Sequence, residues 1–120
     1  MYNKIVRTQP LKLVTRDLED SLVKLKLNST WKINENRTSL IRECVFPDFE
    51  STWAFLTRVS MRSHLWGHHP TITTSFNKVK LELSTHDLDD KGAISDIDLK
   101  MANRIEKYIN IYNDKIRNLD

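Results

Sequence analysis

The sequence has a single cysteine, Cys44, among its 120 residues. One thiol excludes an internal disulfide framework and a zinc site built from cysteines. Long apolar runs are also missing, since none approaches the roughly 20 residues that span a bilayer, and we therefore expect no membrane partner. Cys44 lies in a strand-like run, which predicts a small core or half-buried residue rather than a reactive thiol.

Most of the chain lacks a basic excess. Residues 1–16 hold four of the nineteen Lys and Arg side chains and no acid, which leaves fifteen basic against sixteen acidic side chains elsewhere. We therefore expect no direct binding of nucleic acid, which requires a basic surface. The basic start resembles a mitochondrial targeting segment, and a disordered N-terminus of a cytoplasmic or nuclear protein is the alternative. The chain is thus divided into this segment, residues 1–16, and one domain, residues 17–120, with a single modest core.

Apolar periodicity predicts the element order α-β-β-α-β-β-α. Helices are expected over residues 15–26, about 49–65 and about 95–116, and strands over 31–33, 39–46, 71–76 and 79–85. The last strand alternates between apolar and polar residues, which is typical of a strand with one covered face. Asn77 and Lys78 are expected to form the tight turn before it. The sequence therefore predicts an α+β fold, with three helices packed on one face of a four-stranded antiparallel sheet.

Local residues indicate where the helices begin and end. Asp48 is a good N-cap for the second helix, and Gly67 is its expected C-terminal stop. Ser95 and Asp98 form a variant of the capping box, with Asp in place of Glu, at the start of the third helix.

All four histidines of the chain fall within residues 64–86, and no other stretch concentrates reactive groups to this degree. His64 and His68 are four residues apart, the spacing of paired zinc ligands on a helix, and His69 and His86 could complete a metal site. Gly67 opposes this interpretation because it is expected to end the helix before His68. A metal-free acid–base site is the second interpretation, since imidazoles exchange protons near neutral pH. The third interpretation is that these are surface or core histidines with no catalytic or metal-binding role. Because four histidines fall in one short stretch, the first two interpretations are favoured over histidines without a functional role.

Several motifs together resemble the pterin-4a-carbinolamine dehydratase family. They are His68-His69-Pro70, the aromatic Phe76, a strand that ends in Thr85-His86, and Asp98 just inside the last helix. The resemblance covers about residues 29–110. It implies dehydration of a 4a-hydroxytetrahydropterin to the quinonoid dihydropterin and water, in tetrahydrobiopterin recycling, by histidine acid–base catalysis without metal or cofactor.

The resemblance also implies roles for individual residues. His68 and His86 would be the acid–base pair, and His69, the third catalytic histidine, would mainly bind and position the pterin. Asp98 would support His86 or the substrate. His64 and Phe76 stand at the family's remaining substrate-binding positions, and His64 replaces the Glu of many members.

The family implies partners as well. The expected small-molecule partner is the pterin substrate, and the expected assembly is a homodimer or homotetramer. Some members act as dimerisation cofactors for a homeodomain transcription factor. A non-catalytic, oligomeric protein-binding role on the same fold is therefore the alternative function.

Overall fold

The computed structural model describes Leu13 and residues 15–86 and 91–118. The expected targeting segment, residues 1–16, lies almost wholly outside the described residues. The chain forms seven elements in the predicted order: α1 (Thr15–Lys24), β1 (Lys32–Ile33), β2 (Leu40–Val45), α2 (Phe49–Trp66), β3 (Thr71–Ser75), β4 (Lys78–Leu83) and α3 (Asp96–Asn118).

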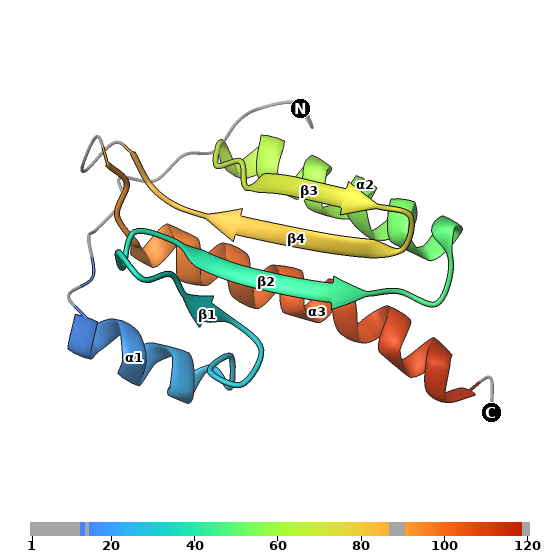
Figure 1. The fold of residues 1–120 in the computed structure, drawn as a ribbon, viewed down its shortest axis with the longest axis horizontal. Helices are drawn as coiled ribbons and strands as arrows, with labels where there is room; N and C mark the ends of the chain where they lie inside the picture. The colour runs from blue at the N-terminus through green and yellow to red at the C-terminus, as the bar shows by residue number, and fades with distance from the viewer. Residues whose placement is uncertain (1–12, 14, 87–90, 119–120) are drawn as a thin grey trace.

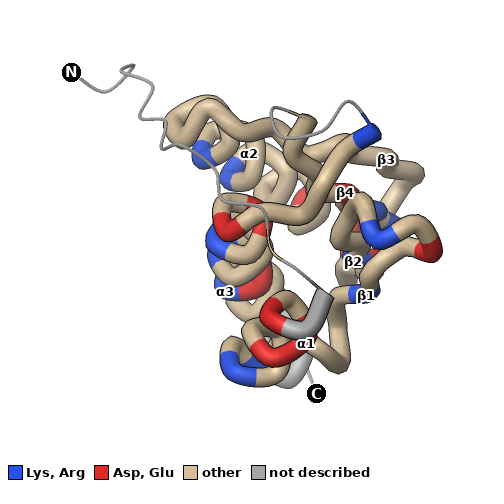
Figure 2. Tube along the Cα trace, turned by 90° about the vertical axis from the view of Figure 1, so that its left-hand side faces the viewer, with Lys and Arg blue, Asp and Glu red and all other residues tan. Residues whose placement is uncertain are grey.

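The four strands form one antiparallel sheet with the order β1-β2-β4-β3 (Figure 1). Figure 2 shows the three helices together on one side of this sheet. The predicted fold class is confirmed. In the central strand β4, Val79, Leu81 and Leu83 are buried toward the helices, whereas Lys78 and Lys80 are exposed on the other face. The uncovered face of β4 is therefore polar.

The core lies between the sheet and the helices. Its largest fully buried side chains include Trp31, Phe55, Leu81, Met101 and Ile105. None of the helices in the described ranges is long and apolar enough to cross a membrane.

A partly buried ion pair lies at one side of this core. The Arg42 guanidinium donates from Nε to Glu106 Oε1 at 2.9 Å and from Nη2 to Oε2 at 3.1 Å, and Trp31 Nε1 donates to Oε1 at 2.9 Å. Cys44 nearby is half-buried, as predicted. Burial raises the pKa of its thiol from 9.0 to about 11, an effect that Arg42 opposes and Glu106 reinforces. The thiolate form is thereby disfavoured, which agrees with a structural rather than a reactive cysteine.

The turn between β3 and β4 is one residue earlier than predicted. Ser75 pairs with Lys78, so Phe76 and Asn77 form the turn, and Phe76 adopts a φ of 53°. The physical reason is a contact with the end of β2. The Phe46 N–H donates to the Asn77 carbonyl, and Asn77 Nδ2 donates to the Phe46 carbonyl, both at 2.9 Å. This pair fixes Asn77 and leaves the left-handed position to Phe76.

Other element ends differ by one or two residues. Helix α1 ends at Lys24 rather than residue 26, because Lys26 has a φ of 61°. Strand β1 begins after Trp31, whose N–H donates to the Leu27 carbonyl at 2.8 Å instead of to a strand. Strand β4 ends at Leu83, and beyond it Thr85 makes an isolated bridge with Ala93.

Candidate active site

The centre of the histidine region is a fully buried carboxylate, Asp98, in the first turn of α3. Its Oδ1 lies 2.5 Å from His68 Nε2, and its Oδ2 accepts from Thr85 Oγ1 at 2.8 Å and from the Ser95 N–H at 2.9 Å. The Ser95 bond confirms the predicted capping interaction. One side chain therefore holds three chain segments together at this end of the sheet.

The residues that Asp98 holds each precede a second histidine. His68 is followed by His69, and Thr85 is followed by His86. In extended backbone, successive side chains point to opposite faces. His68 and Thr85 are turned toward the helices, whereas His69 and His86 are exposed and line one pocket on the other side. Asp98 thus positions both pocket histidines through their inward-facing neighbours.

This pocket has a volume of about 280 Å³. It opens at the end of the sheet where β4 finishes and β3 begins. Its lining is polar and consists of Thr38, Ser39, His69, Thr71, Glu82, Ser84, His86 and Lys91. Small-ligand pockets begin at about 300 Å³, so the space suits one small polar molecule.

The turn between β1 and β2 supplies one wall. Asn34 Oδ1 accepts from the N–H groups of Thr38 and Ser39 at 2.7 and 2.9 Å, which folds this turn on itself. Ser39 Oγ then donates to Glu82 Oε2 at 3.1 Å, and Ser84 Oγ donates to the Thr38 carbonyl at 2.6 Å. These bonds hold the turn against β4 beside the histidines.

Gly92 supplies the space in which His86 lies. Its φ is +91°, and a Cβ added there would stand 2.5 Å from Ser84 Oγ and 3.3 Å from His86 Nε2. Any larger residue would therefore be strained and would push against both side chains. A glycine at this position is required by the close approach.

His64 lies in the last turn of α2 and is exposed, with its ring centroid 6.1 Å from that of His69. Gly67 ends the helix, as predicted, with a φ of 65°, and the His68 N–H donates back to the Ser63 carbonyl at 3.0 Å. His68 therefore leaves the helical path, and the paired-ligand spacing of His64 and His68 is not realised. Among the described residues, no three His, Cys, Asp or Glu side chains are arranged to hold a metal ion.

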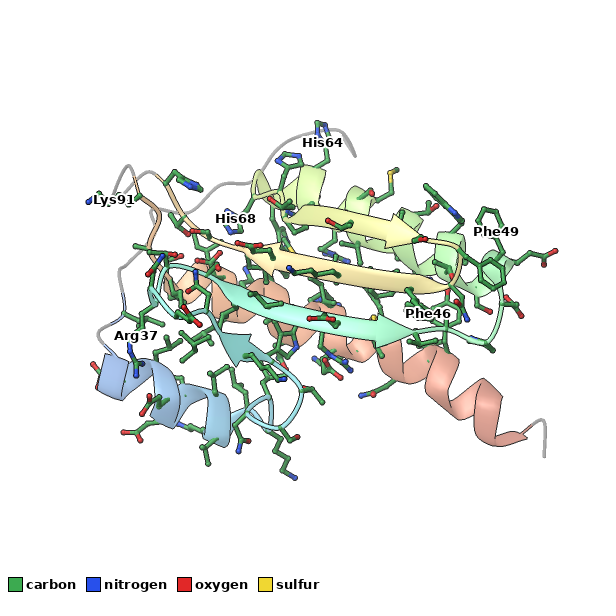
Figure 3. All side chains as sticks on the ribbon, in the orientation of Figure 1. Arg37, Phe46, Phe49, His64, His68 and Lys91 are labelled. Carbon is green, nitrogen blue, oxygen red and sulfur yellow. The ribbon has the colours of Figure 1, made fainter. Side chains whose placement is uncertain are left out.

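Three predicted substrate-binding residues, His64, Asp98 and Phe76, do not line the histidine pocket. Asp98 is paired with His68, not with His86, and it is fully buried, so it positions groups rather than lining the pocket. Phe76 lies at the far end of β3, roughly 17 Å from Thr71 at about 3.3 Å per strand residue, where its ring stacks on Phe49 at 6.4 Å. Figure 3 shows the same separation, with His68 and Phe49 near opposite ends of the sheet.

The remaining pocket residues were not predicted from the sequence. Glu82, Ser84 and His86 alternate along β4 and the segment just beyond it, and this alternation was the available indication that they line a common site. Thr38, Ser39 and Lys91 reach the pocket only through the fold, because they come from two separate turns.

Comparisons with known proteins identify relatives of this chain. Residues 12–108 match the family model described as pterin 4 alpha carbinolamine dehydratase. A Saccharomyces cerevisiae protein, whose name assigns it this dehydratase activity provisionally, is 54% identical over 91% of this chain and 96% of its own length. The Drosophila melanogaster pterin-4-alpha-carbinolamine dehydratase is 33% identical over 71% of this chain and 43% of its own.

A solved structure shares the fold. It is described as a transcriptional coactivator/pterin dehydratase from Brucella melitensis. It superposes with a TM-score of 0.73 at 22% identity and covers 82% of this chain and 98% of its own.

Proposed function

The chain belongs to the pterin-4-alpha-carbinolamine dehydratase family, and we propose that it dehydrates a 4a-hydroxytetrahydropterin to the quinonoid dihydropterin and water. The observation that carries this proposal is the pocket shared by His69 and His86, with the His68–Asp98 pair immediately behind it. Relatives named for the same reaction support the substrate class.

The reaction needs one base and one acid. The N5–H bond of the substrate breaks, its electrons form the N5=C4a double bond, and the C4a–O bond breaks as the hydroxyl takes up a proton and leaves as water. No electrons are gained or lost overall. Two imidazoles can perform both proton transfers, because their protonation changes near neutral pH.

We assign the base to His68, the role that the family resemblance implies; its side chain is 14% exposed and stands behind the pocket lining, so the substrate must enter deeper than the lining residues to reach it. Because Asp98 Oδ1 accepts from His68 Nε2, that nitrogen carries the proton of the neutral ring, which leaves Nδ1 as the acceptor. The buried carboxylate also stabilises the imidazolium that forms when His68 takes the N5 proton, as in other histidine–carboxylate pairs.

We assign the acid to His86 and substrate positioning to His69. His86 is exposed in the pocket, so it can take up a proton from solvent between turnovers and donate it to the departing hydroxyl. His69 faces the same space, and the pocket also holds the hydroxyl group of Thr71, which can pair with the polar edge of a pterin. In a cell that uses tetrahydrobiopterin, this activity would recycle the cofactor of aromatic amino-acid hydroxylases.

The test is turnover of chemically generated 4a-hydroxytetrahydropterin by chelator-treated protein. His68→Gln and His86→Gln are expected to lower kcat by about a hundredfold or more, whereas His69→Gln is expected mainly to raise KM. His64→Gln tests the predicted substrate-binding role of the fourth histidine; because its side chain is exposed in the last turn of α2, kcat is expected to be unchanged and only KM can rise. Wild-type turnover at the spontaneous rate, from folded protein, would refute the proposed activity.

A second candidate function is protein binding by an oligomer. Four large apolar side chains, Val45, Phe49, Trp53 and Phe76, are exposed around the β3–β4 turn and the start of α2. The Phe49 ring lies 6.2 Å from Trp53 and 6.4 Å from Phe76, so three of them form one aromatic surface. Such surfaces mark interaction sites. Light scattering of wild type and Phe49→Ser tests self-association through this surface. The wild-type protein is expected to be an oligomer that Phe49→Ser weakens, and a wild-type monomer would contradict self-association.

We also propose a mitochondrial location, on the basic, acid-free composition of residues 1–16. The test is import into isolated mitochondria of the full-length protein and of a variant that lacks residues 1–16. Uptake that does not depend on the segment would contradict it.

A further inference from the structure

Two stripes of side chains face each other where α2 meets α3. On α2, Arg58, Arg62 and Trp66 recur every four residues, and on α3, Lys100, Arg104 and Tyr108 do the same. Residues four apart lie on one face of a helix. Figure 2 shows Lys and Arg positions on neighbouring turns of the two helices, on the side away from the sheet. We call these six residues the helix seam.

The cations of the seam converge on one indole ring. Lys100 Nζ lies 4.4 Å from the centroid of the Trp66 ring, and the guanidinium carbons of Arg62 and Arg104 lie 5.2 and 5.7 Å from it. Arg62 Nε also donates to the Tyr108 hydroxyl at 3.2 Å, which fixes its guanidinium. One aromatic ring thus has three positive groups within about 6 Å of its centroid, supplied by two helices.

No ion pair between described residues joins a carboxylate to these charges. The pairs Arg37–Glu19, Arg42–Glu106 and His68–Asp98 all lie outside the seam. Asp96, one turn before Lys100, has an interaction of its own. The two Arg distances place the guanidinium carbons at most about 11 Å apart, close to the Debye length of about 8–10 Å at physiological salt. The three cations therefore repel one another, and the π face of Trp66 offsets only part of this repulsion.

We propose that the helix seam binds a phosphate group. A dianion with several acceptor oxygens can engage two guanidinium groups and one ammonium group at once, whereas a single carboxylate would leave part of the charge unmatched. The seam borders a groove of about 270 Å³ that Arg58, Met61, Arg62 and Tyr108 help to line, with Met61 exposed. The groove gives room for the apolar or sugar part of a phosphorylated compound.

The seam is separate from the histidine pocket. The pocket opens on the uncovered side of the sheet, whereas the seam lies on the helical layer. The proposal therefore does not depend on the dehydratase activity, and it concerns a second ligand. The phosphate group can belong to a soluble phosphorylated molecule or to the headgroup of an anionic phospholipid, and the experiment distinguishes the two.

The test compares two variants that lose the same charge. Lys100→Gln/Arg104→Gln removes two seam cations, and Lys24→Gln/Lys32→Gln removes two exposed cations from α1 and β1. Pyrophosphate binding is measured by calorimetry over a series of salt concentrations. Cosedimentation with phosphatidylglycerol/phosphatidylcholine vesicles tests the lipid source. Pterin turnover of both variants is measured in parallel.

The seam variant is expected to bind at least about tenfold more weakly, and the control within about twofold of wild type. Selective loss of pyrophosphate binding supports a soluble ligand, and selective loss of vesicle binding alone supports a headgroup. Absence of both kinds of binding in wild type, or equal weakening in the two variants, would overturn the proposal. Turnover is expected to be unchanged in both variants, so failure of the seam and failure of the dehydratase assignment are distinguishable.

Discussion

Replacement of Asp98 by asparagine tests the central contact of the site. Asparagine has the same shape but presents one acceptor oxygen in place of two. If that oxygen keeps the bonds from Thr85 and Ser95, at 2.8 and 2.9 Å, the amide nitrogen must face His68 Nε2. Two donors would then meet, unless His68 moves its proton to Nδ1. In that tautomer Nδ1 can no longer accept the N5 proton.

The magnitudes follow from these bonds. A hydrogen bond to a charged group contributes about 1.5–3 kcal/mol, and we expect Asp98→Asn to lower the free energy of unfolding by about 2 kcal/mol. General-base catalysis contributes about 10²–10⁴ in rate, so kcat is expected to fall by about a hundredfold or more while KM changes little.

Three measurements are combined: urea unfolding, turnover, and the ¹⁵N shifts of the His68 ring, which report its tautomer. Thr85→Val is the matched control, because it removes one bond to Asp98 Oδ2 and leaves the His68 contact in place. It also removes the contact with Ser95 Oγ at 2.7 Å, and it is expected to cost about 1–2 kcal/mol of stability. Its kcat is expected to fall less than that of Asp98→Asn, because the variant loosens the placement of His86 but leaves the His68 tautomer unchanged. A folded Asp98→Asn protein with unchanged kcat and an unchanged His68 tautomer would refute the assigned role of the pair.

Three further predictions concern single positions. Gly92→Ala is expected to cost about 1–3 kcal/mol of stability and to lower kcat/KM, because its Cβ would press on Ser84 and His86; unchanged urea midpoint and turnover would contradict this. Since burial raises the Cys44 pKa from 9.0 to about 11, iodoacetamide at pH 9 is expected to react about 50-fold more slowly with folded than with urea-unfolded protein, and equal rates would show that the thiol is not protected. The same shift means that the folded state holds this proton more tightly, so the Cys44 contribution to stability is full below pH 9 and is lost as pH rises toward 11. Phe76→Ala is expected to leave KM and kcat within about twofold of wild type, because Phe76 stacks on Phe49 at the far end of β3; a large rise in KM would return Phe76 to the substrate site.

Local patterns predicted the elements because their causes are local. The alternation in β4 follows from burial of one strand face, and the end of α2 follows from the conformational freedom of Gly67. The turn at Phe76 was missed because a bulky residue rarely adopts a positive φ. Only the hydrogen bonds between Asn77 and Phe46, which is 31 residues away, determine that it does so here.

The sequence by itself determined the fold class, the order of the elements and the stretch that carries the histidines. It did so because these properties depend on side-chain periodicity and on residue type. The tertiary structure alone decided that Asp98 holds His68 rather than His86, and that Thr38 and Lys91 reach the pocket. It also brought Trp66 of α2 among the cations of α3. Such pairings join segments that are distant in the chain, and their geometry is set by how the helices pack on the sheet.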